Sequence, residues 1–221
     1  MNDSPSDPAA AKSALRKQAA ARRVALVAED PDAAARLAAQ SDIIADMARR
    51  DERAADERAA DDRPADERAA IVAAYLPIRS ELSPLPLVDR LAARGIITAM
   101  PETPAPGNAL VFRRWAPGDD LVDGPYGTRQ PSAVAPVVVP KVILAPILAF
   151  DPACWRLGYG GGFYDRTLAG LRDDGLAVRA IGIAFDGQLV DKVPVGPFDV
   201  PLDAVLTPSG LRPAQADDLS P

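Results

Sequence analysis

The residues best suited to chemistry lie in one segment, Arg156 to Arg166, which reads RLGYGGGFYDR. Four glycines stand within the five positions from Gly158 to Gly162, so the backbone there can adopt positive φ and approach a ligand closely. An apolar run precedes the segment and a helix is predicted after it, which would aim free backbone N–H groups at an anion. The guanidinium groups of Arg156 and Arg166, at the two ends, would suit phosphate, and the carboxylate of Asp165 would suit Mg²⁺. The segment therefore predicts a site for a nucleotide phosphate with its metal ion.

Two common phosphate-binding motifs do not describe this segment. No Gly-Lys-Ser/Thr follows the glycines, which excludes a Walker A loop, and no glycine stands three residues after Gly160, which excludes the dinucleotide fingerprint. A glycine-rich turn without function is the alternative, because most glycine clusters are turns. The flanking arginines, aspartate and aromatics favour a binding site.

Composition limits the other classes of function. The chain has 221 residues, enough for one domain with a sizeable core. Its net charge of −6 and pI near 4.8 argue against a nucleic-acid partner. The single cysteine, Cys154, cannot form an internal disulfide, and no N-terminal apolar region or membrane span is evident, so we expect a cytoplasmic protein. There is no histidine, which excludes Ser-His and Cys-His nucleophile pairs and histidine metal sites.

The first seventy residues predict helices and a charged insertion. Residues 9–28 and a stretch after Pro31 are predicted helices, and residues 1–9 are expected to be disordered. Residues 51–70 repeat Asp, Glu, Arg and Ala with a five-residue period that matches neither helix nor strand. We interpret this tract as a solvated low-complexity insertion rather than a partner-binding element.

From residue 71 onward, strands and helices alternate. The predicted strands are 71–76, 96–100, 109–115, 142–148 and 178–185, and the predicted helices are 85–94 and 163–172. Loops 101–107 and 117–136 are long enough for a binding or lid role, and residues 209–221 are expected to form a disordered tail. This alternation predicts an α/β fold with a mostly parallel sheet and the glycine loop at its carboxyl edge.

The segment Arg156–Arg166 closely resembles the glycine loop of the 5-formyltetrahydrofolate cyclo-ligase (methenyltetrahydrofolate synthetase) family. Further similar pieces follow the family's order from residue 10 to 208: Lys12–Arg16, Tyr75–Pro77 followed by Glu81, the spacing of Phe112, Trp115 and Gly118, Ala145–Asp151, and Phe198–Thr207. The resemblance implies that residues 1–221 form a single three-layer α/β/α Rossmann-like domain with a helical N-terminal region.

The resemblance also implies the reaction and the site. The expected activity is the ATP- and Mg²⁺-dependent conversion of 5-formyltetrahydrofolate to 5,10-methenyltetrahydrofolate, through phosphorylation of the formyl oxygen and with release of ADP and phosphate. It assigns ATP binding to Lys12, Arg16, Arg156, Leu157, Gly158, Tyr159, Gly160, Gly161, Gly162, Phe163 and Tyr164. Substrate binding falls to Leu76, Glu81 and Trp115 and to Tyr159, Gly160, Gly161, Gly162 and Phe163. Asp165 and Asp199 correspond to the metal ligands, and Arg156, Tyr164 and Arg166 are the expected catalytic residues.

Without the resemblance, these residues have simpler interpretations. Lys12 and Arg16 would be surface cations, either aspartate a cap or turn residue, and Trp115 a core aromatic. The chain also departs from the family pattern at Gln130, Lys141, Trp155, Gly196 and Phe198, which concerns substrate positioning more than reaction class.

Three other functions remain open. They are an ATP-dependent ligase acting on another formamide or carboxyl substrate, a non-catalytic nucleotide- or folate-binding relative, and an interaction protein organised around residues 51–70. We expect only small-molecule partners, namely ATP and a reduced folate, with no nucleic acid or membrane, and a monomer.

Overall fold

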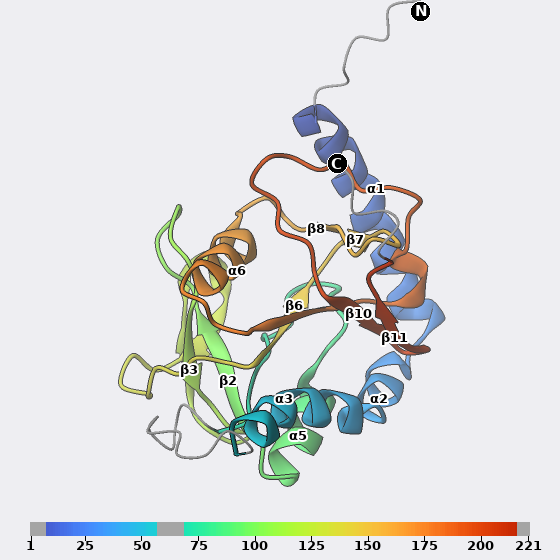
Figure 1. Ribbon diagram of the computed structural model, residues 1–221. Helices are drawn as coiled ribbons and strands as arrows, with labels where there is room; N and C mark the ends of the chain where they lie inside the picture. Colours follow the sequence, from blue (N-terminus) through green and yellow to red (C-terminus); the bar gives the residue numbers. More distant parts are fainter. Residues whose placement is uncertain (1–7, 57–68, 216–221) are drawn as a thin grey trace, which may run out of the picture.

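The computed structural model describes residues 8–56 and 69–215 (Figure 1). A seven-stranded sheet with the order β11-β10-β9-β6-β1-β2-β3 forms its centre. The parallel strands are β1 (Ile71–Ala73), β2 (Ile97–Glu102), β6 (Val142–Pro146), β9 (Arg179–Ile183) and β10 (Ala204–Thr207). The antiparallel strands β3 (Val111–Arg114) and β11 (Gly210–Pro213) form the two edges. The predicted mostly parallel sheet is confirmed.

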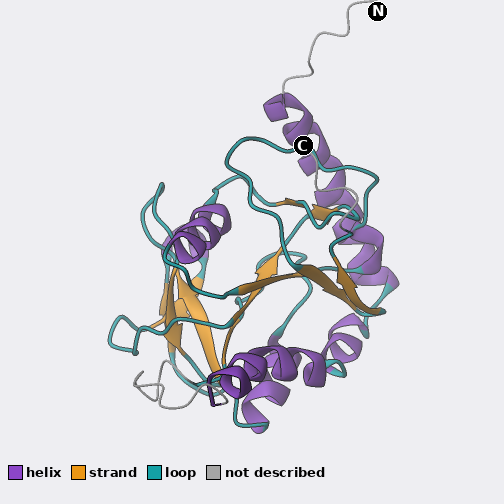
Figure 2. Cartoon of the chain, viewed as in Figure 1, coloured by secondary structure: helices purple, strands orange, loops and turns teal. Residues whose placement is uncertain are grey.

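Helices cover both faces of this sheet (Figure 2). They are α2 (Ala33–Ala38), α3 (Ser41–Asp56) and α5 (Leu85–Ala93) on one face, and α6 (Phe163–Asp173) on the other. Side chains alternate between the faces along each strand. In β6, Leu144 shares a buried cluster with Leu87 of α5, whereas its neighbour Ile143 shares one with Leu168 of α6. The three-layer α/β/α arrangement is therefore confirmed.

The N-terminal helix α1 (Pro8–Glu29) lies beyond the carboxyl ends of the parallel strands rather than in either helical layer (Figure 1). There it packs on the short hairpin of β7 (Ala149–Phe150) and β8 (Arg156–Leu157). Ala19 of α1 shares a buried cluster with Leu148 and Leu157, and Leu15 packs against that cluster. This position brings the N-terminal helix to the edge of the sheet where the glycine loop begins.

Several expected element boundaries need correction. The tail expected at 209–221 is wrong for Gly210–Pro213, which form β11 because they complete an antiparallel ladder with β10. The loop expected at 117–136 contains a hairpin of β4 (Leu121–Asp123) and β5 (Arg129–Pro131), joined by the 3-10 turn η1 (Pro125–Gly127). A second 3-10 turn, η2 (Asp186–Gln188), follows β9.

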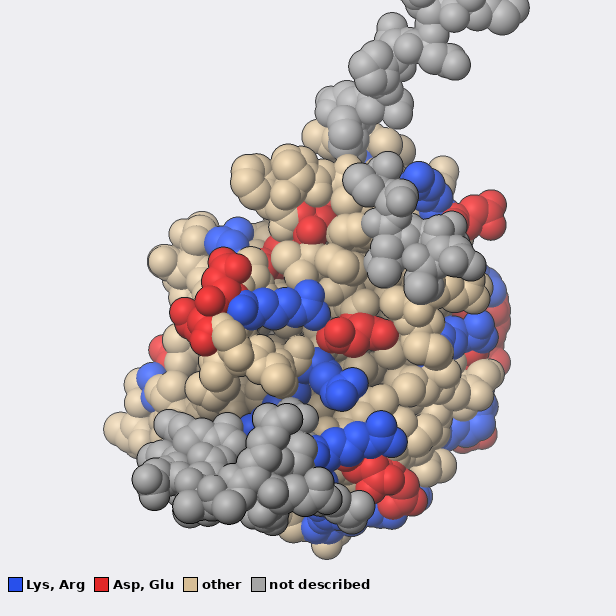
Figure 3. Space-filling view, viewed as in Figure 1, with Lys and Arg blue, Asp and Glu red and all other residues tan. Residues whose placement is uncertain are grey.

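The expected disordered N-terminus (1–9) and the charged low-complexity tract (51–70) fall mostly on undescribed residues. Residues 1–7, 57–68 and 216–221 lie outside the described part of the chain. Of the charged tract, residues 51–56 continue helix α3, and residues 8 and 9 already belong to α1. In the described ranges no helix combines the length and apolar character needed to cross a membrane. On the face shown in Figure 3, basic and acidic side chains are interspersed.

Candidate active site

The glycine loop connects β8 to α6 at the carboxyl edge of the sheet. Leu148 N–H donates to Leu157 O at 2.7 Å, which holds the loop entrance close to the end of β6. Gly160 and Gly162 have positive φ values of +97° and +67°, a conformation that other residues adopt only with strain. A Cβ on Gly160 would lie 3.2 Å from the Arg16 guanidinium, and one on Gly162 would lie 2.5 Å from Arg166. Glycine is therefore favoured at both positions by the backbone conformation, and a side chain there would also displace an arginine.

Helix α1 brings the two predicted N-terminal cations to this loop. Arg16 Nε donates to Gly158 O at 3.0 Å, across 142 positions of sequence. One helical turn earlier, Lys12 Nζ forms an ion pair with Asp199 Oδ2. Lys12 and Arg16 thus join the glycine loop to the segment that carries Asp199.

Arg156 is hydrogen-bonded to Asp165, one of the two predicted metal ligands, and to Val200, which follows the other one, Asp199. The Arg156 side chain is only 6% exposed, and its Nη2 donates to Asp165 Oδ1 at 2.6 Å while Nη1 donates to Val200 O. Val200 N–H donates to the same oxygen of Asp165 at 3.1 Å, which connects Asp165 to the residue after Asp199. Burial lowers the pKa of Arg156, and the nearby charges of Asp165 and Asp199 oppose that shift. The guanidinium stays cationic beside the carboxylates.

The two carboxylates suit a magnesium ion that is completed by substrate. In the described residues their hydrogen bonds use Asp165 Oδ1 and Asp199 Oδ2, which leaves the second oxygen of each carboxylate. Both side chains are about a quarter exposed (25% and 24%). No cluster of three or more acidic or cysteine side chains suited to a metal occurs within residues 8–56 and 69–215. One or two carboxylates, with phosphate oxygens and water supplying the rest, is the usual arrangement for Mg²⁺.

Glu81 lies in the loop that follows β1, near the glycine loop. Its Oε2 accepts a hydrogen bond from Ile78 N–H at 2.9 Å. Burial raises the pKa of Glu81, while that hydrogen bond and the charges of Arg23 and Arg79 lower it. From α6, burial and the Glu81 charge raise the pKa of Tyr164, so this hydroxyl keeps its proton at neutral pH. The site therefore offers a carboxylate acceptor beside a phenol donor.

One polar residue of this region was missed by the sequence analysis. Arg23 of α1 is 2% exposed, and its guanidinium donates to Ser80 Oγ at 3.2 Å, Ile147 O at 3.2 Å and the Tyr159 hydroxyl. The signal that could have found it is helical spacing: residues 12, 16, 19 and 23 lie on one stripe of a helix. The exposed neighbour Arg22 interrupts that pattern in the sequence.

Trp115 shares the large buried cluster against which Leu76 packs, but it lies near the amino ends of the parallel strands, at the opposite end of the sheet from the glycine loop. Its backbone N–H donates to Thr98 O at 2.9 Å, near the start of β2, whereas Leu76 and Glu81 follow the other end of β1. The Trp115 ring is buried in the cluster beneath α2, α3 and α5, and its Nε1 donates to Asp119 O at 3.1 Å. Trp115, which directly follows β3, packs in the core, as its simpler interpretation predicts.

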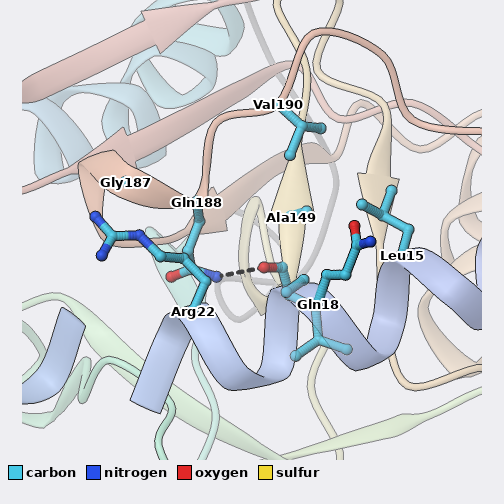
Figure 4. A pocket seen from close by; sticks show the side chains of 9 residues that line it. Leu15, Gln18, Arg22, Ala149, Gly187, Gln188 and Val190 are labelled. Carbon is cyan, nitrogen blue, oxygen red and sulfur yellow. Dashed lines mark hydrogen bonds between the residues drawn. The ribbon is translucent and has the colours of Figure 1, made fainter. Parts of the chain in front are cut away.

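A shallow pocket beside α1 lies apart from these groups (Figure 4). Gln18 and Arg22 reach into it from α1, and Gly187 and Val190 line the opposite wall. Gln188 Nε2 donates to Leu148 O at 2.9 Å and so fixes the floor. None of the predicted ATP-, folate- or metal-binding residues lines this pocket.

Comparison with known proteins agrees with the arrangement around the glycine loop. Residues 8–208 match the 5-formyltetrahydrofolate cyclo-ligase family. The chain belongs to this family. Among curated members, it is 37% identical over 146 residues to the 5-formyltetrahydrofolate cyclo-ligase of Escherichia coli K12, covering 64% of this chain and 79% of that protein. The corresponding enzyme of Mycolicibacterium smegmatis is 35% identical over 145 residues, covering 62% and 73%.

Two solved structures share the fold. The 5,10-methenyltetrahydrofolate synthetase of Aquifex aeolicus superposes with a TM-score of 0.61 at 24% identity, covering 91% of this chain and 92% of that one. That of Mycoplasma pneumoniae gives 0.58 at 22% identity, covering 89% and 98%. These similarities support the three-layer architecture of this family member across nearly its whole length.

Proposed function

We propose that this chain converts 5-formyltetrahydrofolate to 5,10-methenyltetrahydrofolate with consumption of ATP. The observation that carries the proposal is the meeting of four distant segments at one edge of the sheet. Lys12 and Arg16 of α1, the glycine loop, the Asp165–Asp199 pair and the Glu81 loop all lie there. Phosphate-binding cations, a carboxylate pair and a partly buried acceptor are the groups that this reaction needs.

The nucleotide would occupy the glycine loop. Its residues from Arg156 to Tyr164 would surround ATP, with Lys12 and Arg16 approaching the phosphates from α1. Asp165 and Asp199 would hold Mg²⁺ through their second carboxylate oxygens. When bound, Mg²⁺ would neutralise phosphate charge. Lys12, which already contacts Asp199, would then be available to the phosphate oxygens.

The folate would lie beside the nucleotide, toward the Glu81 loop. Glu81 would accept hydrogen bonds from donor groups of the pterin, with Leu76 packing nearby. Tyr159, the glycines Gly160, Gly161 and Gly162, and Phe163 would face both substrates from the loop between them. We omit Trp115 from the folate site, because its ring is buried in the core near the start of β2.

The chemistry follows from the poor leaving ability of the formyl oxygen. The formyl oxygen attacks the γ-phosphorus of ATP, the bond to the β–γ bridging oxygen breaks, and ADP leaves. The N10 nitrogen then attacks the activated carbon and loses its proton. The carbon–oxygen bond breaks last, and phosphate leaves with the former formyl oxygen. No covalent enzyme intermediate is needed, so catalysis rests on positioning and on charge stabilisation.

Three residues have proposed catalytic roles. Arg156 would stabilise charge that develops on the transferred phosphoryl group, while Asp165 fixes its orientation. Tyr164 would donate its proton in a hydrogen bond, because its raised pKa keeps it neutral. Arg166 Nη2 donates to Gly161 O at 2.7 Å and so holds the loop around the phosphates.

The same proposal includes the cellular setting. We propose that the protein acts as a cytoplasmic monomer on small molecules, without a nucleic-acid or membrane partner. The net charge of −6 supports the absence of a nucleic-acid partner. The buried single Cys154 supports a reducing compartment.

The test is near-ultraviolet absorbance of the protein with 5-formyltetrahydrofolate, Mg²⁺ and ATP, since the conjugated methenyl product absorbs where the substrate does not. We expect a signal that requires ATP and is lost in Asp165→Ala. If protein that binds ATP gives no signal, the folate assignment is wrong, and a screen of other formamide substrates should follow.

A further inference from the structure

Arg23 is the most deeply buried charged group of this region that the proposed mechanism does not use. Its hydrogen-bond partners among the described residues are neutral oxygens in three segments: Ser80 in the Glu81 loop, Ile147 after β6, and Tyr159 in the glycine loop. A guanidinium removed from water without a contacting carboxylate is costly. Such a group is retained where it has a specific task.

The Arg23 fork connects the two loops that would hold the folate. Tyr159 is 43% exposed, so its ring remains accessible to a ligand while its hydroxyl accepts a hydrogen bond from Arg23. The Arg23 guanidinium carbon also lies 5.4 Å from the Tyr159 ring centre. Because Arg presents several donors in a rigid plane, one side chain can fix the spacing of both loops.

We propose that Arg23 is a positioning residue of the folate site, which holds Tyr159 and the Glu81 loop in place. This inference rests on the proposed function, since it concerns how the pterin acceptor is held. Arg23 acts through Tyr159 and Glu81 and does not itself touch the reacting atoms.

The charged and titratable groups around Glu81 determine what loss of Arg23 does. Arg79 from the same loop and Arg23 from α1 favour the ionised carboxylate, whereas burial opposes it. Tyr75 at the end of β1 and Tyr164 on α6 also face Glu81, and both stay neutral near pH 7. Removing the Arg23 charge therefore raises the pKa of Glu81 further. As the pH is lowered, folate binding that needs the ionised carboxylate is then lost at a higher pH than in the wild type.

The experiment measures equilibrium binding of 5-formyltetrahydrofolate and of ATP by calorimetry from pH 5.5 to 8.5, together with turnover and melting temperature. Arg23→Gln removes the charge, Arg23→Lys keeps the charge but loses the fork, and Arg22→Gln is the matched control. Arg22 is the exposed neighbour that pairs with Glu29 at 2.8 Å. Its substitution should leave folate binding unchanged.

We expect Arg23→Gln to weaken folate binding by about 10-fold at pH 7. ATP binding should weaken less, because Tyr159 is the one proposed nucleotide-binding residue to which Arg23 is hydrogen-bonded among the described residues. The pH below which folate binding is lost should rise. Arg23→Lys should weaken folate binding but keep this pH at its wild-type value. The proposal is overturned if Arg23→Gln behaves like Arg22→Gln, or if its losses follow the melting temperature while this pH does not change. If Arg23→Gln does not fold, Arg23→Lys decides: an unchanged folate affinity overturns the proposal.

Measurements on the wild-type protein distinguish failure of this inference from failure of the proposed reaction. Folate binding without turnover overturns the proposed reaction alone, and the titrations still test Arg23. If the unchanged chain does not bind folate, both proposals fail.

Discussion

The carboxyl edge of the sheet and the face covered by α2, α3 and α5 differ in whether charged side chains are buried. At the edge, Arg23 is 2% exposed and the Arg156 side chain is 6% exposed, each bound to segments distant in sequence. On the helical face, the interior is apolar, and the ion pair of Arg94 with Asp42 lies at the surface. Burying charge costs free energy that apolar packing does not. The protein buries cations where ligands would bind and excludes them where only packing is needed.

Asp165→Ala should give the largest effect, because it leaves the buried Arg156 without its carboxylate. We expect the free energy of unfolding to fall by about 3 kcal/mol and turnover to fall by about 100-fold or more. Denaturant unfolding and the absorbance assay measure these changes. Asp42→Ala, which breaks the exposed pair with Arg94, is the control and should cost less than about 1 kcal/mol. Equal losses in the two variants would remove the distinction between the regions.

Leu87→Ala tests the apolar face alone. The Leu87 side chain of α5 is fully buried against the sheet, so we expect a loss of about 3 kcal/mol in unfolding free energy. Turnover per folded molecule, assayed well below the melting temperature, should not change, because Leu87 packs in the apolar cluster and is not one of the proposed site residues. Val24→Ala, at a position that is 62% exposed, is the control for stability. A lower kcat in Leu87→Ala would show that the two regions are coupled.

Gly160→Ala should produce a moderate and local effect. Its φ of +97° would be strained and its Cβ would displace the Arg16 guanidinium, so we expect the KM for ATP to rise about 10-fold. Gly118→Ala shares the strain, at φ +99°, but meets nothing within 4 Å. Both variants should lose similar stability, and only Gly160→Ala should affect ATP. Matching KM values would mean that Arg16 does not contribute to nucleotide binding.

Glu81→Gln should give the smallest effect on stability, and one that depends on pH. Burial raises the pKa of Glu81 above the ordinary 4.5, so folding favours its protonated form. The free energy of unfolding of the wild type therefore falls as the pH rises from the pKa of Glu81 in the unfolded chain through its higher pKa in the folded protein. Gln cannot ionise, so the variant does not lose this stability. The melting temperature of the variant minus that of the wild type should therefore be higher at pH 7 than at pH 4. Melting temperatures at both pH values test this, with the exposed Glu29→Gln as control; a difference of the opposite sign would contradict it.

The sequence predicted the fold and the glycine loop because both rest on local patterns. Strand alternation and the glycines of 158–162 are visible in short windows. The pairing of distant strands is not visible in short windows. Strand β11 was missed because its residues form a strand only by pairing with β10. Arg23 was missed because its burial depends on where α1 docks: helical spacing aligns it with Lys12 and Arg16, but it does not show that this stripe is buried. Trp115 was assigned by motif spacing, which does not reveal which end of a strand an aromatic occupies.

The docking of α1 has a consequence for synthesis of the protein on the ribosome. Lys12 and its partner Asp199 are 187 positions apart, and Arg16 and Gly158 are 142 apart. Translation proceeds at roughly 5–20 residues per second, so α1 emerges many seconds before its charged partners exist. A nascent chain cannot complete the site at the carboxyl edge until almost the whole protein has been made. Premature termination before residue 199 therefore yields chains that cannot complete this site, whatever part of the sheet they form.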